Sequence, residues 1–195
     1  MSAFAISYAV LWMLLLILTV MVLLLYRHFG VLSMDTADGH SRDGVAIGSR
    51  APALGADAAL IRAERTRVLL FASASCAPCQ GILPYFNELA LTHGEDLQVV
   101  AVTKTGDETE LRRRAPGLKV VADGDATISK SYRVSISPFA FVVDQNGTVQ
   151  SKGLVSEVAH LRRLLRQGGL TQMAEEFVTL GPIDPQRKVN LDERI

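Results

Sequence analysis

Two cysteines, Cys76 and Cys79, constrain what this chain can fold into more than any other feature. They are the only cysteines of the 195 residues, and Ser73-Ala74-Ser75 separates them from the apolar run at 68–72. If that run is a buried strand that turns into a helix, Cys76 lies at the helix N-terminus, where unpaired N–H groups and the helix dipole favour the thiolate. We therefore predict that Cys76 is the nucleophile of a thiol-disulfide exchange site and that Cys79 resolves the mixed disulfide.

Zinc binding and a purely structural disulfide are the two other interpretations of this pair. A structural zinc ion usually takes four ligands, and none of the candidate histidines is paired at ligand spacing. These histidines are His28, His40, His93 and His160. A disulfide that closes so short a loop removes little entropy from the unfolded chain. We expect no metal and no cofactor beyond a redox-active Cys76–Cys79 disulfide.

The N-terminal part of the chain is strongly apolar. Residues 4–26 form a run of 23 residues without a charge, interrupted only by Ser7 and Thr19. As a helix this run would extend roughly 34 Å, enough to cross a bilayer with some tilt. No Lys or Arg precedes the run and no small-residue cleavage site follows it, which argues against a cleaved signal peptide. We predict a transmembrane anchor over residues 1–29 and a polar tether over 30–47.

The charges near this anchor leave its orientation open. Arg27, Arg42 and Arg50 follow the apolar run and no basic side chain precedes it. The positive-inside rule therefore weakly favours a cytoplasmic C-terminal domain. The acidic side chains between these arginines count little in that rule.

Beyond the tether, segments rich in β-formers alternate with helical segments, which predicts an α/β domain over residues 48–170. Strands are expected at 67–72, 97–103, 119–122, 139–143 and 148–152, and helices at 77–92, 107–114, 126–132 and 156–166. Asn146-Gly147 predicts a hairpin between the last two strands. The order indicates a central mixed sheet flanked by helices. Residues 171–195 are expected to form a C-terminal tail that begins with one short helix.

A serine–proline pair, Ser137-Pro138, stands immediately before the predicted hairpin. Together with Cys76-Ala77-Pro78-Cys79 and Pro84, it makes residues 48–153 resemble the thioredoxin/redoxin superfamily. The resemblance implies a thioredoxin-like fold in which a cis Pro138 faces the redox pair. It also implies that the substrate contacts Ser137, Pro138, Ala77 and Pro78.

More narrowly, the chain resembles the MauD family of methylamine utilisation proteins. The similarity includes the uncleaved N-terminal helix, Ser75-Cys76-Ala77-Pro78-Cys79, Ile82-Leu83-Pro84, Tyr132-Arg133-Val134-Ser135 and Lys152-Gly153-Leu154. This resemblance implies a protein of the inner membrane whose redox domain lies in the periplasm, an oxidising compartment. There it would assist disulfide formation in the methylamine dehydrogenase small subunit and exchange electrons with the polytopic membrane protein MauE. The net charge of zero suggests no nucleic-acid partner.

Two departures from thioredoxin leave the direction of electron flow open. Ser75 replaces the tryptophan that commonly precedes the first cysteine, and Leu70 stands where the buried proton-relay acid would fall. Without that acid a thioredoxin-like reductant is less well supported, but Ala77-Pro78 offers no side-chain donor to the thiolate, so strong oxidant character is not evident either. A reductant of cytochrome c maturation, in the manner of TlpA or ResA, is an alternative, and so is a non-catalytic periplasmic escort. A peroxiredoxin is less well supported, because its Pro-x-x-x-Thr-x-x-Cys motif is absent before Cys76.

Overall fold

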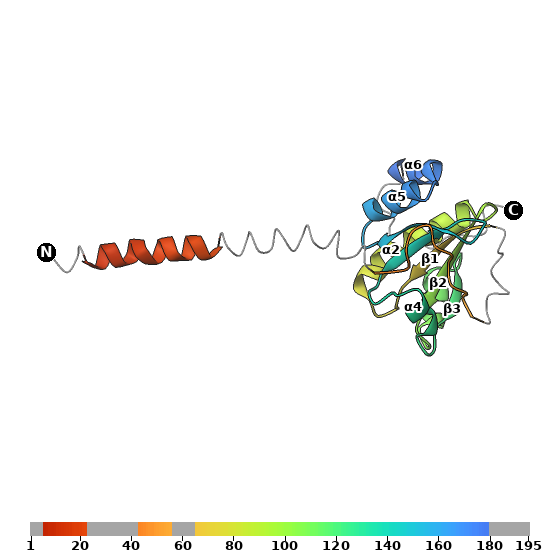
Figure 1. The fold of residues 1–195 in the computed structure, drawn as a ribbon, viewed down its shortest axis with the longest axis horizontal. Coiled ribbons are helices and arrows are strands. Elements are labelled where there is room, and N and C mark those ends of the chain that lie inside the picture. Colours follow the sequence, from red (N-terminus) through yellow and green to blue (C-terminus); the bar gives the residue numbers. More distant parts are fainter. Residues whose placement is uncertain (1–5, 23–42, 56–64, 180–195) are drawn as a thin grey trace. The chain divides into compact units, whose positions relative to one another are not determined.

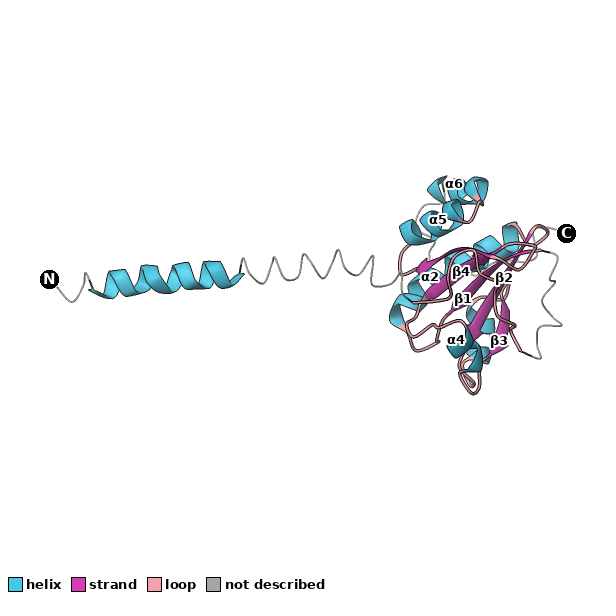
Figure 2. Ribbon diagram, in the orientation of Figure 1, coloured by secondary structure: helices cyan, strands magenta, loops and turns pink. Residues whose placement is uncertain are grey.

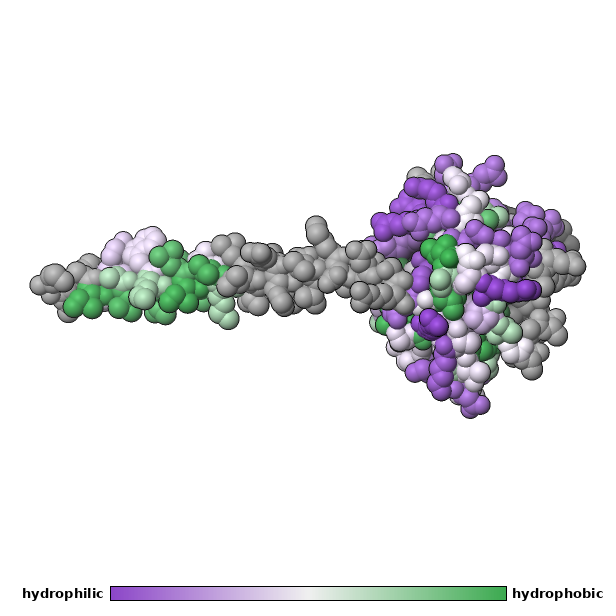
Figure 3. All heavy atoms as spheres, viewed as in Figure 1, coloured by the Kyte–Doolittle hydropathy of each residue, from purple (hydrophilic) through white to green (hydrophobic). Residues whose placement is uncertain are grey.

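The computed structural model describes residues 6–22, 43–55 and 65–179 (Figure 1). It divides into two compact units, Met1–Arg42 and Asp43–Ile195. The first unit contains a helix over residues 6–22, which carries hydrophobic surface (Figure 3). Leu14 and Leu18 are among its exposed apolar side chains. No helix within the described ranges is long and apolar enough to cross a membrane. Both ends of the predicted span at 4–26, and tether residues 30–42, lie outside the described residues.

The second unit is built on a five-stranded sheet in the order β3-β2-β1-β4-β5 (Figure 2). The strands are β1 (Thr66–Phe71), β2 (Leu97–Thr103), β3 (Lys119–Ala122), β4 (Phe139–Val143) and β5 (Val149–Leu154). β1 pairs in parallel with β2, and β2 with β3, whereas β4 runs antiparallel to both β1 and β5. The predicted mixed sheet and its antiparallel hairpin are therefore confirmed.

The helices of this unit follow the predicted order. They are α2 (Ala77–Thr92), α3 (Glu108–Arg114), α4 (Thr127–Ser131), α5 (Val158–Gln167) and α6 (Thr171–Thr179). The segment predicted as a tail thus begins with a packed helix, because α6 contacts α5 and its Ala174 is fully buried. A hydrogen bond between His93 Nε2 and Glu176 Oε2, at 2.8 Å, also joins α6 to the end of α2.

Two hydrophobic cores cover the two faces of the sheet. Residues at alternate positions of β1 point to opposite faces, so Val68 and Leu70 lie in one core and Leu69 and Phe71 in the other. The first core contains side chains of α2, α3, α5 and α6, while the second contains α4 and residues near the start of the unit. Burial on both faces explains why β1 and β2 read as nearly continuous apolar runs.

Residues 43–47, at the end of the predicted tether, are hydrogen-bonded to the domain at two places. One is the segment before the Ser137-Pro138 pair, and the other is Lys152 of β5. The N–H of Gly44 donates to the Arg133 carbonyl at 2.8 Å, and Lys152 Nζ donates to the Asp43 carbonyl at 2.7 Å. Gly44 has a φ of +78°, and a Cβ atom there would lie 2.8 Å from the Phe141 ring. Only glycine suits this position, because it tolerates both the backbone conformation and the close approach.

Tyr132 is part of the second core and is hydrogen-bonded to the first residues of the domain. The ionisation of this side chain makes the stability of the domain depend on pH. Its hydroxyl donates to the Pro52 carbonyl at 2.7 Å, and burial raises the pKa of Tyr132 from 10.0 to about 12. The unfolded tyrosine ionises first, so the stability it contributes is complete below about pH 10 and is lost as the pH rises towards 12.

We expect the wild type to lose up to about 1.4 kcal/mol per pH unit in that window through this group. Tyr132→Phe should remove this part of the pH dependence. It should also cost about 1 kcal/mol at neutral pH, because the Pro52 carbonyl loses its donor. Urea unfolding at about pH 9 and pH 11, followed by far-UV circular dichroism, measures both effects. Equal pH dependence in the two proteins would contradict the assignment.

Candidate active site

The redox pair lies where β1 passes into α2. Cys76 and Cys79 form a disulfide, and Cys76 occupies the N-cap position of α2, where its Sγ accepts a hydrogen bond from the Cys79 N–H at 3.3 Å. Cys76 is half-buried, whereas Cys79 is only 2% exposed. An incoming sulfur atom can therefore reach Cys76 and not Cys79, which supports the predicted division of roles between them.

The Ser137-Pro138 pair lies beside the disulfide. Its peptide bond is cis, and the Ser137 carbonyl oxygen is 3.7 Å from Cys76 Sγ. The Ser137 group that the structure brings to this sulfur is thus the backbone carbonyl. The disulfide sulfur carries no proton, so only the reduced Cys76 thiol could donate to this oxygen. Such a hydrogen bond would favour the thiol over the thiolate.

The other predicted substrate contacts surround the disulfide. Ser137 is exposed, while Pro138 is buried and its carbonyl accepts from the Val155 N–H at 3.0 Å. Ala77 and Pro78 form the exposed first turn of α2. A proline suits this turn because its missing N–H would have no partner within the helix. The predicted contact residues beside Cys76 thus have small, uncharged side chains. Their contacts with a substrate stay a prediction.

Asp107 is a residue of this site that the sequence analysis missed. Its Oδ2 accepts hydrogen bonds from the Ser73 hydroxyl at 2.8 Å and from the Ala74 N–H at 3.0 Å. Ala74 is also held through its carbonyl, which accepts a hydrogen bond from Gln80 Nε2 at 2.9 Å. The signal was present, since Asp107 follows β2 closely and the carboxyl ends of neighbouring parallel strands meet at one edge of a sheet.

Leu70 is fully buried in β1, so the side chain at the position of the thioredoxin relay acid is apolar, as the sequence indicated. Within residues 6–22, 43–55 and 65–179, no group of three or more His, Cys, Asp or Glu side chains is arranged to hold a metal ion. In the described part of the site, the polar groups around the two sulfurs include the Ser137 carbonyl, the Ser73 hydroxyl and the Asp107 carboxylate.

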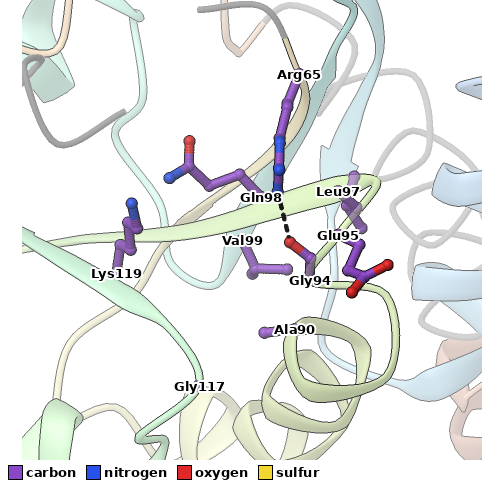
Figure 4. Close-up of a pocket in the computed structure, with 9 residues that line it drawn as sticks. All are labelled: Arg65, Ala90, Gly94, Glu95, Leu97, Gln98, Val99, Gly117 and Lys119. Atoms are coloured by element: carbon purple, nitrogen blue, oxygen red, sulfur yellow. Dashed lines mark hydrogen bonds between the residues drawn. The ribbon is translucent and has the colours of Figure 1, made fainter. Parts of the chain in front are cut away.

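A groove of about 350 Å³ lies elsewhere in the domain (Figure 4). Among the residues that line it are Arg65, Gln98 and Lys119. They stand at the amino ends of the parallel strands β1, β2 and β3, whereas Cys76 follows the carboxyl end of β1. The groove is therefore separate from the redox site.

A disulfide at a strand–helix junction beside a cis-proline, on this sheet topology, is the arrangement of thiol-disulfide oxidoreductases with the thioredoxin fold. Residues 56–152 match the AhpC/TSA family. A protein of Chlorobium tepidum described as a thiol:disulfide interchange protein DsbE is similar in structure, with a TM-score of 0.56 and 25% identity. The similarity covers 67% of this chain and 99% of that one.

Curated relatives narrow this class further. The methylamine utilization protein MauD of Methylobacillus flagellatus is 30% identical over 105 residues, which is 51% of this chain and 49% of the relative. MauD of Methylophilus methylotrophus is 28% identical over 113 residues, or 55% and 52% of the two chains. The chain thus spans about half the length of these relatives. It is similar to MauD proteins and has a thioredoxin-like fold.

Proposed function

We propose that this protein assists disulfide formation in the small subunit of methylamine dehydrogenase. The observation that carries the proposal is the contrast between the accessible Cys76 sulfur beside the Ser137 carbonyl and the buried Cys79. A thiolate of the reduced subunit attacks Cys76 Sγ, forms a mixed disulfide and releases Cys79. A second thiolate of the subunit then attacks the mixed disulfide, which leaves the subunit oxidised and both cysteines reduced.

Each such cycle transfers two electrons to the cysteine pair, so another partner must take them up before the next cycle. We propose the polytopic membrane protein MauE for this role, on the basis of the resemblance to the MauD family. Membrane attachment would keep the two proteins together. The uncharged run at 4–26 and the exposed apolar side chains of the helix at 6–22 support such an anchor.

We place the redox domain in the periplasm, at the inner membrane, because a disulfide catalyst suits an oxidising compartment. Alkaline phosphatase fused after Ile195 is active only outside the cytoplasm and therefore reports this location. We expect an active fusion. An inactive phosphatase fusion, together with fluorescence from green fluorescent protein fused at the same position, would contradict it.

The client is tested with the oxidised full-length protein and the reduced small subunit. We expect disulfides to form in the subunit at least about tenfold faster than with a Cys76→Ser variant, because the variant lacks the accessible sulfur. Mass spectrometry after alkylation counts the remaining thiols. If the reduced protein reduces a disulfide-bonded apocytochrome c faster than the oxidised protein forms disulfides in the small subunit, the alternative of a maturation reductant is favoured. Equal subunit maturation with Cys76→Ser would favour an escort without catalysis.

A further inference from the structure

Asp107 occupies the N-cap position of α3, yet its side chain makes no hydrogen bond to that helix. Aspartate is favoured at N-caps because its carboxylate accepts from the free N–H groups of the first turn. Here the carboxylate instead binds the Ser73 hydroxyl and the Ala74 N–H, 34 and 33 residues away. The contact cannot be explained as a local cap, and it holds the loop that leads into Cys76.

The hydrogen bonds of this loop have a defined direction. An ionised carboxylate only accepts, so Ser73 donates its hydroxyl proton to Asp107. The Ser73 oxygen, 2.9 Å from the Ser75 oxygen, then accepts the proton of the Ser75 hydroxyl. The chain of hydrogen bonds Asp107–Ser73–Ser75 therefore ends on the oxygen of Ser75, the residue that precedes Cys76. Successive hydrogen bonds of this kind polarise one another in the direction set by the charge.

We propose that Asp107 sets the redox balance of the Cys76–Cys79 pair by disfavouring the Cys76 thiolate. The N-terminus of α2 stabilises that thiolate, and the carboxylate and the oxygen end of the hydroxyl chain oppose this effect. The proposal rests on the oxidoreductase activity alone and is independent of the client. In this role Asp107 is a positioning and electrostatic residue that acts on the sulfur from the adjacent loop.

Exchange with glutathione shows why the charge matters. Two glutathione thiols reduce the Cys76–Cys79 disulfide and leave as oxidised glutathione. Of the two protons they bring, one stays on Cys79, and the other is released when Cys76 is a thiolate. The negative charge appears only in the reduced protein, so a neighbouring carboxylate favours the disulfide and makes the protein a weaker oxidant.

Asp107→Asn in the full-length protein tests the proposal. Asparagine keeps the size of the side chain and an oxygen that accepts from the Ala74 N–H, but it removes the charge. We expect the glutathione equilibrium to shift towards the dithiol by roughly three- to tenfold, the scale of one partly screened charge. The ultraviolet absorbance of the Cys76 thiolate should also appear at lower pH.

Two control variants separate charge from structure. Gln80→Ala removes the other hydrogen bond that holds Ala74 and leaves the charge in place. Glu108→Gln removes a neighbouring charge whose Oε2 accepts from the Gly106 N–H rather than from the redox loop. Both should leave the glutathione equilibrium within about twofold of the wild type.

The outcomes distinguish this proposal from the proposed function. An Asp107→Asn equilibrium equal to that of the wild type would overturn the role of Asp107. An equal shift in Gln80→Ala would assign the effect to loop structure, and an equal shift in Glu108→Gln would assign it to general surface charge. Each of these outcomes rejects the proposal while the wild type still exchanges with glutathione, so the oxidoreductase activity would stand.

Discussion

Cys79→Ser is expected to turn the protein from a catalyst into a trap for its client. In the wild type, Cys79 lies within the same first turn as Cys76, and its thiolate breaks the mixed disulfide intramolecularly when the client has no second thiolate to attack it. An intramolecular thiol is present at a very high effective concentration, so its loss should prolong the mixed disulfide at least about a hundredfold. This is the largest kinetic effect that we predict.

The trap is prepared by converting Cys76 of the Cys79→Ser variant into a mixed disulfide with thionitrobenzoate. The client is used as a variant with a single cysteine, so that no second client thiolate can break the adduct. Its thiolate attacks Cys76 Sγ and releases the yellow thionitrobenzoate anion, whose absorbance gives the rate. The Cys76–client disulfide is detected on non-reducing gels. Cys76→Ser is the matched control, and it should form no adduct within minutes because Cys79 is 2% exposed. An adduct that forms equally through Cys79 would reverse the assigned roles.

Phe141→Ala should have the largest effect on stability. Phe141 is fully buried in β4, and its ring centroid lies 5.2 Å from those of Tyr132 and Phe139 and 5.8 Å from that of Phe71. Truncation leaves a cavity among these rings, and such changes cost about 3–5 kcal/mol. That is a large part of the 5–15 kcal/mol typical of a whole domain.

Urea unfolding of the Phe141→Ala variant, followed by far-UV circular dichroism, measures this loss. Trp12 is the only tryptophan and belongs to the first unit, so circular dichroism is used in place of tryptophan fluorescence. Ile47→Ala is the control, because Ile47 is 60% exposed and should change stability by less than about 0.5 kcal/mol. A loss below about 1 kcal/mol for Phe141→Ala would show that the aromatic cluster repacks.

The elements of the sheet were predictable because their signals are local. β2 matches the predicted range 97–103, and α2 matches 77–92, since each element carries its own hydrophobic pattern and is bounded by turn residues. Asn146-Gly147 predicted the hairpin of β4 and β5, and Gly147 has the φ of +79° that such turns require. The strand order was less accessible, because it depends on pairings between segments far apart in the chain.

The site was predictable to the extent that its chemistry is adjacent in sequence. The motif at 76–79 and Ser137-Pro138 indicated the reaction class and the facing proline loop. The contact of the Asp107 carboxylate with the redox loop was not predicted, because more than thirty positions separate the two in the sequence. An aspartate at the start of a helix is also typical of a helix cap. The binding of Asp43 and Gly44 to the domain was likewise hidden within a polar, glycine-containing segment.

By itself, the amino-acid sequence determined that two sulfurs, separated by two residues at a strand–helix junction, are the reactive groups of this protein. Only the tertiary structure decided that Cys76 is partly exposed while Cys79 is buried. It also decided that the Ser137 carbonyl contacts Cys76 and that the Asp107 carboxylate binds the loop before it. The reason is physical: helix and strand preferences depend on a few neighbouring residues, whereas exposure and electrostatic environment depend on every segment that the fold brings to the same place.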